Sequence, residues 1–175
     1  SWNQDQINNS QSPLVSLLIP TRDGVELLEQ CIKSIIEKTT YPNYEIIILD
    51  NQSSKPDTHL YFKHIVEDKR VRVIEYDFPF NFSGINNYGA SFAEGEILGL
   101  INNDIEIISP DWLSEMVSHA TRSDIGCVGA KLYFENDAIQ HGGVITGLGG
   151  VAGHSHKYAD RHDPGYFCRL KLVQN

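Results

Sequence analysis

The sequence predicts an α/β fold in which a mostly parallel sheet carries helices on both faces. Short apolar segments rich in β-branched residues alternate along the chain with longer segments whose apolar residues recur at helical spacing. Apolar residues make up 41% of the 175 residues, which is enough for one packed core, and no internal repeat interrupts the alternation. The order of the segments is therefore that of repeated β–α units.

The predicted strands are short apolar runs that stop at turn-forming residues. The first, residues 14–19, stops at Pro20, and the second, residues 45–49, stops at Asp50. Further strands are expected at residues 71–74, 97–101 and 127–132. Strands of this composition are buried on both faces, as parallel strands are.

The predicted helices lie between these strands, at residues 25–38, 57–68, 85–93 and 112–119. Ser109 as a cap and Pro110 at the first helical position indicate the start of the last helix. Asp23 stands where it could cap the first helix. The glycine-rich residues 142–153 cannot form a regular helix and favour a loop near a ligand.

The length fits one domain. Residues 1–13 are polar and are interpreted as a linker, and residues 14–175 form the predicted domain, which we expect to continue past Asn175. The three cysteines are too far apart for a disulfide framework or a structural zinc site, and we expect them to be buried thiols.

The charge balance narrows the class of ligand. Asp and Glu total 23 against 14 Lys and Arg, which gives a net charge of −9. Proteins that bind nucleic acids need a basic surface, so no nucleic-acid partner is expected, whereas a bound cation could still offset the charge of one phosphorylated small molecule. The apolar runs are far shorter than the roughly 18 residues that span a bilayer, so no transmembrane segment is predicted. The expected location is the cytoplasm, including the inner face of the membrane.

Polar side chains follow each of the first four predicted strands. The carboxyl ends of parallel strands meet at one edge of a sheet, where ligands of open α/β folds bind. The sequence contains neither G-x-G-x-x-G after the first strand nor G-x-x-x-x-G-K-[ST], so a bound diphosphate would need a cation in place of a glycine cradle. Asp104, after the fourth strand, is the expected ligand of that cation. The candidate binding residues are Pro20, Thr21, Arg22, Asp23, Asp50, Asn51, Ser53, Asn86, Asn87, Asn102, Asn103 and Asp104.

Five segments resemble family 2 glycosyltransferases in order and spacing. They are VSLLIPTRD (15–23), EIIILDNQS (45–53), NYG (87–89), GE (95–96) and LINNDIE (100–106). The resemblance implies a GT-A (Rossmann-like) fold and an inverting enzyme that uses a UDP- or dTDP-sugar with Mg²⁺ or Mn²⁺. The later stretch HGGVITGLGGVAGH (141–154) resembles the bacterial subgroup that assembles O-antigen or rhamnan.

The resemblance also implies roles for individual residues. Asp50 matches the acid that binds the edge of uracil or thymine, and the residues of 20–23 and Asn51, Ser53, Asn86, Asn87 and Asn103 would contact the nucleotide. Asn102 and Asp104 match a D-x-D metal motif in which an amide replaces the first carboxylate. Asn86 stands where many members have Arg, which removes a cation from the diphosphate region.

The implied reaction is displacement at the anomeric carbon by a hydroxyl of a saccharide or lipid-linked saccharide acceptor. The general base of the family lies in an acidic motif that we expect beyond Asn175. The alternative function is a non-catalytic module that binds a nucleotide or a protein. A nucleotidyltransferase is disfavoured, because PTRDG is not the glycine-rich, basic loop of that class.

Two further groups of side chains have a structural and a functional interpretation. We expect Phe78, Phe80 and Phe82 to fill the core rather than to form a platform for a sugar. The three histidines of the glycine-rich region are interpreted as loop residues rather than as ligands; they are His141, His154 and His156.

Overall fold

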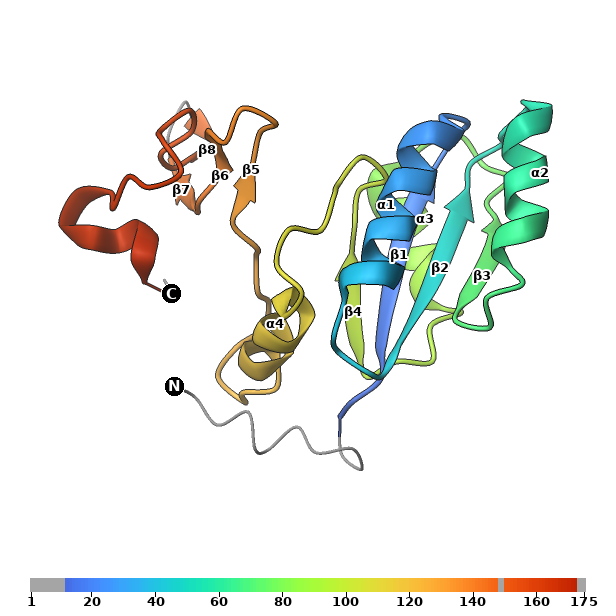
Figure 1. Cartoon of the computed structure of the whole chain (residues 1–175), viewed down its shortest axis with the longest axis horizontal. Coiled ribbons are helices and arrows are strands. Elements are labelled where there is room, and N and C mark those ends of the chain that lie inside the picture. Colours follow the sequence, from blue (N-terminus) through green and yellow to red (C-terminus); the bar gives the residue numbers. More distant parts are fainter. Residues whose placement is uncertain (1–11, 148–149, 173–175) are drawn as a thin grey trace. The chain divides into compact units, whose positions relative to one another are not determined.

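The computed structural model describes residues 12–147 and 150–172 (Figure 1). Residues 1–11 of the expected linker lie outside the described residues. The chain divides into two compact units, the first ending at Ser118 and the second starting at His119. At the start of the first unit, Tyr41 donates a hydrogen bond to the Pro13 carbonyl at 2.6 Å.

The first unit contains a four-stranded, fully parallel sheet in the order β3-β2-β1-β4. Its strands are β1 (Val15–Thr21), β2 (Tyr44–Asp50), β3 (Val71–Glu75) and β4 (Ile97–Leu100). Its helices are α1 (Val25–Lys38), α2 (Pro56–Ile65), α3 (Phe82–Ala90) and α4 (Trp112–Ala120), the last of which ends just beyond the boundary between the units. The first four predicted strands and all four predicted helices are confirmed, with ends that differ by a few residues.

The inner strands β1 and β2 are buried on both faces because α1 and α2 cover one face and α3 covers the other (Figure 1). Alternate side chains point to opposite faces. Leu17 and Ile46 therefore belong to the core shared with α1, whereas Leu18, Ile47 and Leu49 belong to the core shared with α3. This two-sided burial explains why both strands are continuous apolar runs.

The register brings the ends of the parallel strands to one edge. Thr21 pairs with Asp50, and Asp50 pairs with Glu75. The chain after β4 remains paired with β1 for one more residue, because the Ile101 amide donates to the Leu18 carbonyl at 2.9 Å. The loops that follow all four strands therefore start from the same edge of the sheet.

The predicted fifth strand at residues 127–132 is wrong. In the second unit, β5 (Leu132–Tyr133) pairs antiparallel with β6 (Ile139–His141), so no strand from this region joins the parallel sheet. The physical reason is the tight turn between them, in which the Phe134 amide donates to the Ala138 carbonyl at 2.8 Å and provides a local partner strand.

The glycine-rich region forms a second ribbon. β7 (Val144–Thr146) pairs antiparallel with β8 (Ala152–His154), so the expectation of a loop is wrong for these described residues, although it correctly excluded a helix. A short 3₁₀ segment follows at Tyr166–Lys171. Cys31 is buried as expected, but the thiols of Cys127 and Cys168 are exposed. No helix among the residues described is long and apolar enough to cross a membrane.

Candidate functional site

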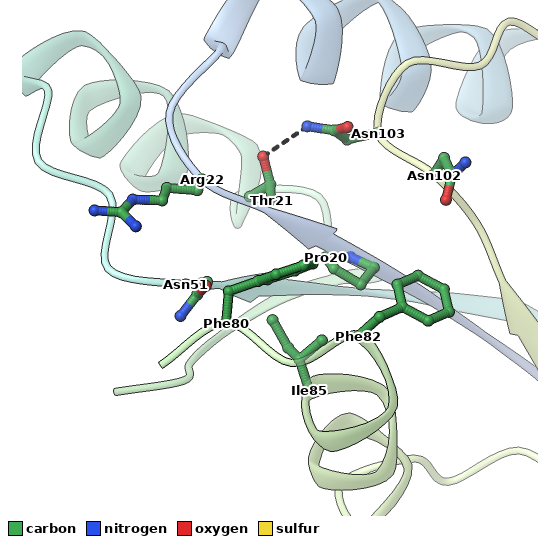
Figure 2. Close-up of a pocket in the computed structure, with 9 residues that line it drawn as sticks. All are labelled: Pro20, Thr21, Arg22, Asn51, Phe80, Phe82, Ile85, Asn102 and Asn103. Atoms are coloured by element: carbon green, nitrogen blue, oxygen red, sulfur yellow. Dashed lines mark hydrogen bonds between the residues drawn. The ribbon is translucent and has the colours of Figure 1, made fainter. Parts of the chain in front are cut away.

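A cavity of about 240 Å³ opens at the carboxyl edge of the sheet (Figure 2). Its walls come from the end of β1, the loops that follow the four strands of the first unit, and the start of α3. One wall carries polar groups, and the other is formed by aromatic and aliphatic side chains. The lining residues are Pro20, Thr21, Arg22, Asn51, Phe80, Phe82, Ile85, Asn102 and Asn103.

The loops after β1 and β2 are held together by short hydrogen bonds. The Asn51 amide donates to the Thr21 carbonyl at 2.8 Å, which extends the pairing of the two strands by one residue. The Asp23 amide donates to Ser53 Oγ at 2.8 Å, and the Ser53 amide donates to Asp50 Oδ1 at 3.0 Å. Asp50 is only 6% exposed and does not line the cavity. Its carboxylate therefore stabilises the loop and does not face the cavity.

Asp23 links the first loop to the start of α2. Its Oδ1 accepts hydrogen bonds from the amides of Ser54 and Lys55, both at 2.9 Å. The bond from Lys55 is the main reason why the pKa of the Asp23 carboxyl lies below its usual range. Burial raises this pKa, and the bond from Ser54 lowers it further. The alternative that Asp23 caps α1 is wrong, because the N-cap is Gly24, at φ 65°, and no side chain caps it.

Asn51 lines the cavity and carries a buried, unpaired acceptor. Its side chain is 2% exposed, and its Nδ2 donates to the carbonyls of Tyr76 at 3.2 Å and Phe78 at 2.8 Å. These two bonds fix the orientation of the amide, since Oδ1 cannot replace a donor between two carbonyls. Asn51 Oδ1 has no partner among the described residues. A buried acceptor without a donor is costly, so a ligand that donates a hydrogen bond here would be stabilised.

The loop after β4 contributes a second polar contact. Asn103 Nδ2 donates to Thr21 Oγ1 at 3.0 Å, as the dashed line in Figure 2 shows, and the Thr21 side chain is buried. The Asn102 side chain is exposed at the cavity, and its backbone carbonyl accepts the Cys31 thiol at 3.6 Å. Burial raises the pKa of Cys31 to about 12, and the charge of Asp104 acts in the same direction. Cys31 is therefore an inert thiol beneath this loop.

Asp104 is exposed beside the cavity rather than in its lining, and its carboxylate makes no hydrogen bond or ion pair with a described residue. The described residues include no group of three or more His, Cys, Asp or Glu that could hold a metal ion. A cage made by the protein alone is therefore absent from this part of the chain. Mg²⁺ and Mn²⁺ are commonly held by one or two carboxylates together with the phosphates of a substrate. Asp104, with the amide oxygen of Asn102, fits a cation of that shared kind.

The remaining predicted binding residues differ in their access to the cavity. Arg22 lines it, is exposed, and makes no hydrogen bond or ion pair within the described ranges. Asn86 is buried in α3, where its Nδ2 donates to the Phe82 carbonyl at 2.8 Å, and Asn87 is exposed; neither lines the cavity. Arg22 is thus the one cation in the lining. The structure brings Pro20, Thr21, Arg22, Asn51, Asn102 and Asn103 to the cavity, and it places Asp23, Asp50, Ser53, Asn86, Asn87 and Asp104 outside its lining.

The expectation that the phenylalanines fill the core is wrong. Phe78, Phe80 and Phe82 are 55%, 65% and 51% exposed, and the last two line the cavity. Asn81 is the N-cap of α3 and accepts from the Gly84 amide at 2.7 Å, so the loop turns into the helix between the two rings. Sequence reasoning missed Phe80, Phe82 and Ile85 as lining residues. The alternation F-P-F-N-F, in which the Asn is the helix cap, was the available signal.

The second unit holds a histidine pair. His141 on β6 and His154 on β8 have their Nδ1 atoms 2.9 Å apart, with the rings at 86° to each other. Burial lowers the pKa of His141, and the neighbouring His154 lowers it further. His156 instead contacts Ser155 Oγ.

Comparisons with known proteins place these observations in a family. A sequence model described as Glycosyl transferase family 2 matches residues 16–163. The chain is 52% identical over 165 residues to the uncharacterized protein y4gI of Sinorhizobium fredii, which covers 94% of this chain and 18% of that protein. It is 40% identical over 143 residues to the O-antigen biosynthesis protein RfbC of Myxococcus xanthus, which covers 82% of this chain and 11% of that protein. The chain therefore spans less than a fifth of the length of these relatives.

A solved structure shares the fold. The mannosyltransferase PcManGT from Pyrobaculum calidifontis, solved in complex with GDP-Man and Mn²⁺, matches with a TM-score of 0.60 at 21% identity, covering 69% of this chain and 37% of that chain. This likeness confirms the predicted α/β fold of GT-A type. Since the family model covers most of the sequence, the chain belongs to glycosyl transferase family 2.

Proposed function

We propose that this chain is the donor-binding part of an inverting glycosyltransferase that uses a UDP- or dTDP-sugar and a divalent cation in the assembly of a bacterial O-antigen or a related polysaccharide such as a rhamnan. The observation that carries the proposal is the cavity shared by four loops, one of whose lining residues, Asn51, has a buried and unpaired Oδ1. The 40% identity to a protein named for O-antigen biosynthesis supports the polysaccharide product, and a saccharide or lipid-linked saccharide is the proposed acceptor.

Asn51 is the residue proposed to form a hydrogen bond with the edge of the nucleobase. Uracil and thymine each carry one imide N–H between two carbonyls, and Asn51 Oδ1 is a buried acceptor that lacks a donor. Asp50 would then act through the loop, because its carboxylate holds the Ser53 amide at 3.0 Å. This assignment moves the base contact from Asp50, which the resemblance implied, to the neighbouring residue.

The other end of the cavity would receive the diphosphate. Asn103 is held by Thr21 at 3.0 Å, which keeps the loop after β4 against the loop after β1. Asp104, free of protein partners in the described part of the chain, would hold the cation together with the phosphate oxygens, and Asn102 would support it. A bound divalent cation would neutralise the charge that develops on the departing nucleoside diphosphate. We assign proton removal from the acceptor to a base beyond Asn175.

Calorimetric titration of the protein with UDP, dTDP and GDP, with and without Mn²⁺, tests the proposal. We expect Asn51→Ala to weaken UDP binding up to about tenfold with or without Mn²⁺, since one neutral hydrogen bond contributes about 0.5–1.5 kcal/mol. Asp104→Ala should remove only the part of the affinity that depends on Mn²⁺. Leu60→Ala is the control, because Leu60 on α2 is exposed and outside the cavity lining. The absence of binding to all three nucleotides in the wild type would overturn the proposal.

A second candidate is a non-catalytic nucleotide-binding module. The observation that favours it is the single free carboxylate beside the cavity, where the D-x-D pattern of the family has two. This candidate predicts nucleotide binding that Mn²⁺ does not change and that Asp104→Ala leaves intact. Strengthening of UDP binding by Mn²⁺, lost in Asp104→Ala, excludes it.

A further inference from the structure

The aromatic residues around the start of α3 fall into two classes. One class is a connected series of four rings, from Tyr76, Phe78, Tyr88 and Phe92. Between ring centroids, Tyr76 lies 5.2 Å from Phe78 and 5.4 Å from Tyr88, and Tyr88 lies 5.0 Å from Phe92. Phe80 makes no ring contact with any described residue, although it follows Phe78 by only two positions. Phe80 and Phe82 are thus the phenylalanines of this loop that make no contact with another ring of the described residues, and both line the cavity.

Phe80 is also the more exposed ring. It is 65% exposed and lines the cavity, so an aromatic side chain that usually buries 150–250 Å² remains in contact with solvent at a concave site. A ring in this position offers a planar apolar face to whatever enters.

Asn51 ties the loop that carries Phe80 to the end of β2. Asn51 Nδ2 donates to the Phe78 carbonyl at 2.8 Å, which ties the backbone two residues before Phe80 to the end of β2. Figure 2 shows Phe80 at the same end of the cavity as Asn51, whereas Phe82 lies toward Asn102. Asn51, with its buried and unpaired Oδ1, and the exposed ring of Phe80 therefore lie at one end of one cavity.

We propose that Phe80 is the stacking platform for the nucleobase of the donor, a role that rests on the proposed function. A base whose N–H edge meets Asn51 Oδ1 needs a support for its flat face, and stacking on an aromatic side chain is a strong and base-tolerant contact. The edge contact selects the base and the ring contributes affinity. Phe82, at the other end, is not assigned to the base.

The test compares binding of UDP, UDP-glucose and inorganic pyrophosphate, each with Mn²⁺, to the wild type, Phe80→Ala, Phe80→Tyr and Phe78→Ala. Stacking on one aromatic ring corresponds to a loss of roughly tenfold or more in affinity when the ring is removed. We expect Phe80→Ala to weaken UDP and UDP-glucose to this extent and to leave pyrophosphate within about twofold, and Phe80→Tyr to restore UDP binding.

Phe78→Ala is the matched control, because Phe78 is 55% exposed and belongs to the same loop but does not line the cavity. It should leave UDP binding within about twofold. Wild-type affinity for UDP in Phe80→Ala would overturn the inference and leave the proposed function intact. Equal losses for UDP and pyrophosphate, or a loss confined to UDP-glucose, would also overturn it. If the wild type binds no nucleoside diphosphate, the proposed function itself fails.

Discussion

Gly89 is where α3 comes closest to the sheet, and replacing it with alanine tests that packing. A Cβ added at Gly89 would lie 2.5 Å from Leu49 Cδ1 and 2.8 Å from Leu49 Cδ2. Carbon atoms in contact are normally about 3.5–4.0 Å apart, so α3 or Leu49 would have to move by about 1 Å. Leu49 is fully buried on β2, which leaves it no free space to enter.

The expected net effect of Gly89→Ala is a loss of about 2 kcal/mol in the free energy of unfolding. Overpacking a core costs roughly 1–3 kcal/mol, and a clash this short against a fully buried side chain favours the upper end. Alanine recovers about 1 kcal/mol through its higher helix propensity. Urea denaturation followed by circular dichroism measures the difference.

Gly126→Ala is the control for this experiment, because a Cβ at Gly126 meets no atom within 4 Å, and its effect should stay within about 0.5 kcal/mol. Adding Leu49→Val to Gly89→Ala should cost less than the sum of the two single changes, since the shorter side chain relieves the clash. Wild-type stability in Gly89→Ala, or strict additivity in the double variant, would refute the packing argument.

Three further predictions concern hydrogen-bonded groups away from the cavity. Ser16→Ala should lower the free energy of unfolding by about 1–3 kcal/mol in the same urea assay. The reason is that the fully buried Ser16 Oγ donates to Glu45 at 2.6 Å and accepts from the Gly95 amide at 2.8 Å. An unchanged midpoint of urea denaturation would contradict this. His154→Ala should raise the pKa of His141 part of the way to its ordinary value of about 6.5, as followed by NMR titration, because burial remains while the neighbouring ring is lost. Since the folded pKa of His141 lies below the unfolded one, its neutral form favours the fold above about pH 6.5, and this contribution decreases as the pH falls below that value. The protection factors of the β6 amides, corrected for the slower intrinsic exchange in acid, should therefore fall with the pH, and protection factors that stay constant would count against this.

The sequence was sufficient for the parallel core because its signals are local and periodic. The apolar runs of β1 and β2 and the helical spacing of α1 each identify their element without knowledge of a partner. The failure at residues 127–132 has the opposite cause. A two-residue strand pairs with whatever chain is nearest, and here the turn at Phe134–Ala138 supplies that chain.

For the candidate site too, the local features were predictable from the sequence and the features that depend on distant residues were not. The apolar runs and the polar residues after them were enough to predict that polar loops would meet at one edge, since parallel strands end together. Which side chains of those loops face the cavity became known from the folded chain alone. The Asp50 carboxylate accepts a hydrogen bond from the Ser53 amide. The Asn51 side chain instead donates to two backbone carbonyls, and this orientation leaves its Oδ1 unpaired. The Asn51 amide depends on the Phe78 carbonyl 27 positions away, and the Asn103 amide depends on Thr21 82 positions away, and no spacing along the chain encodes such partners.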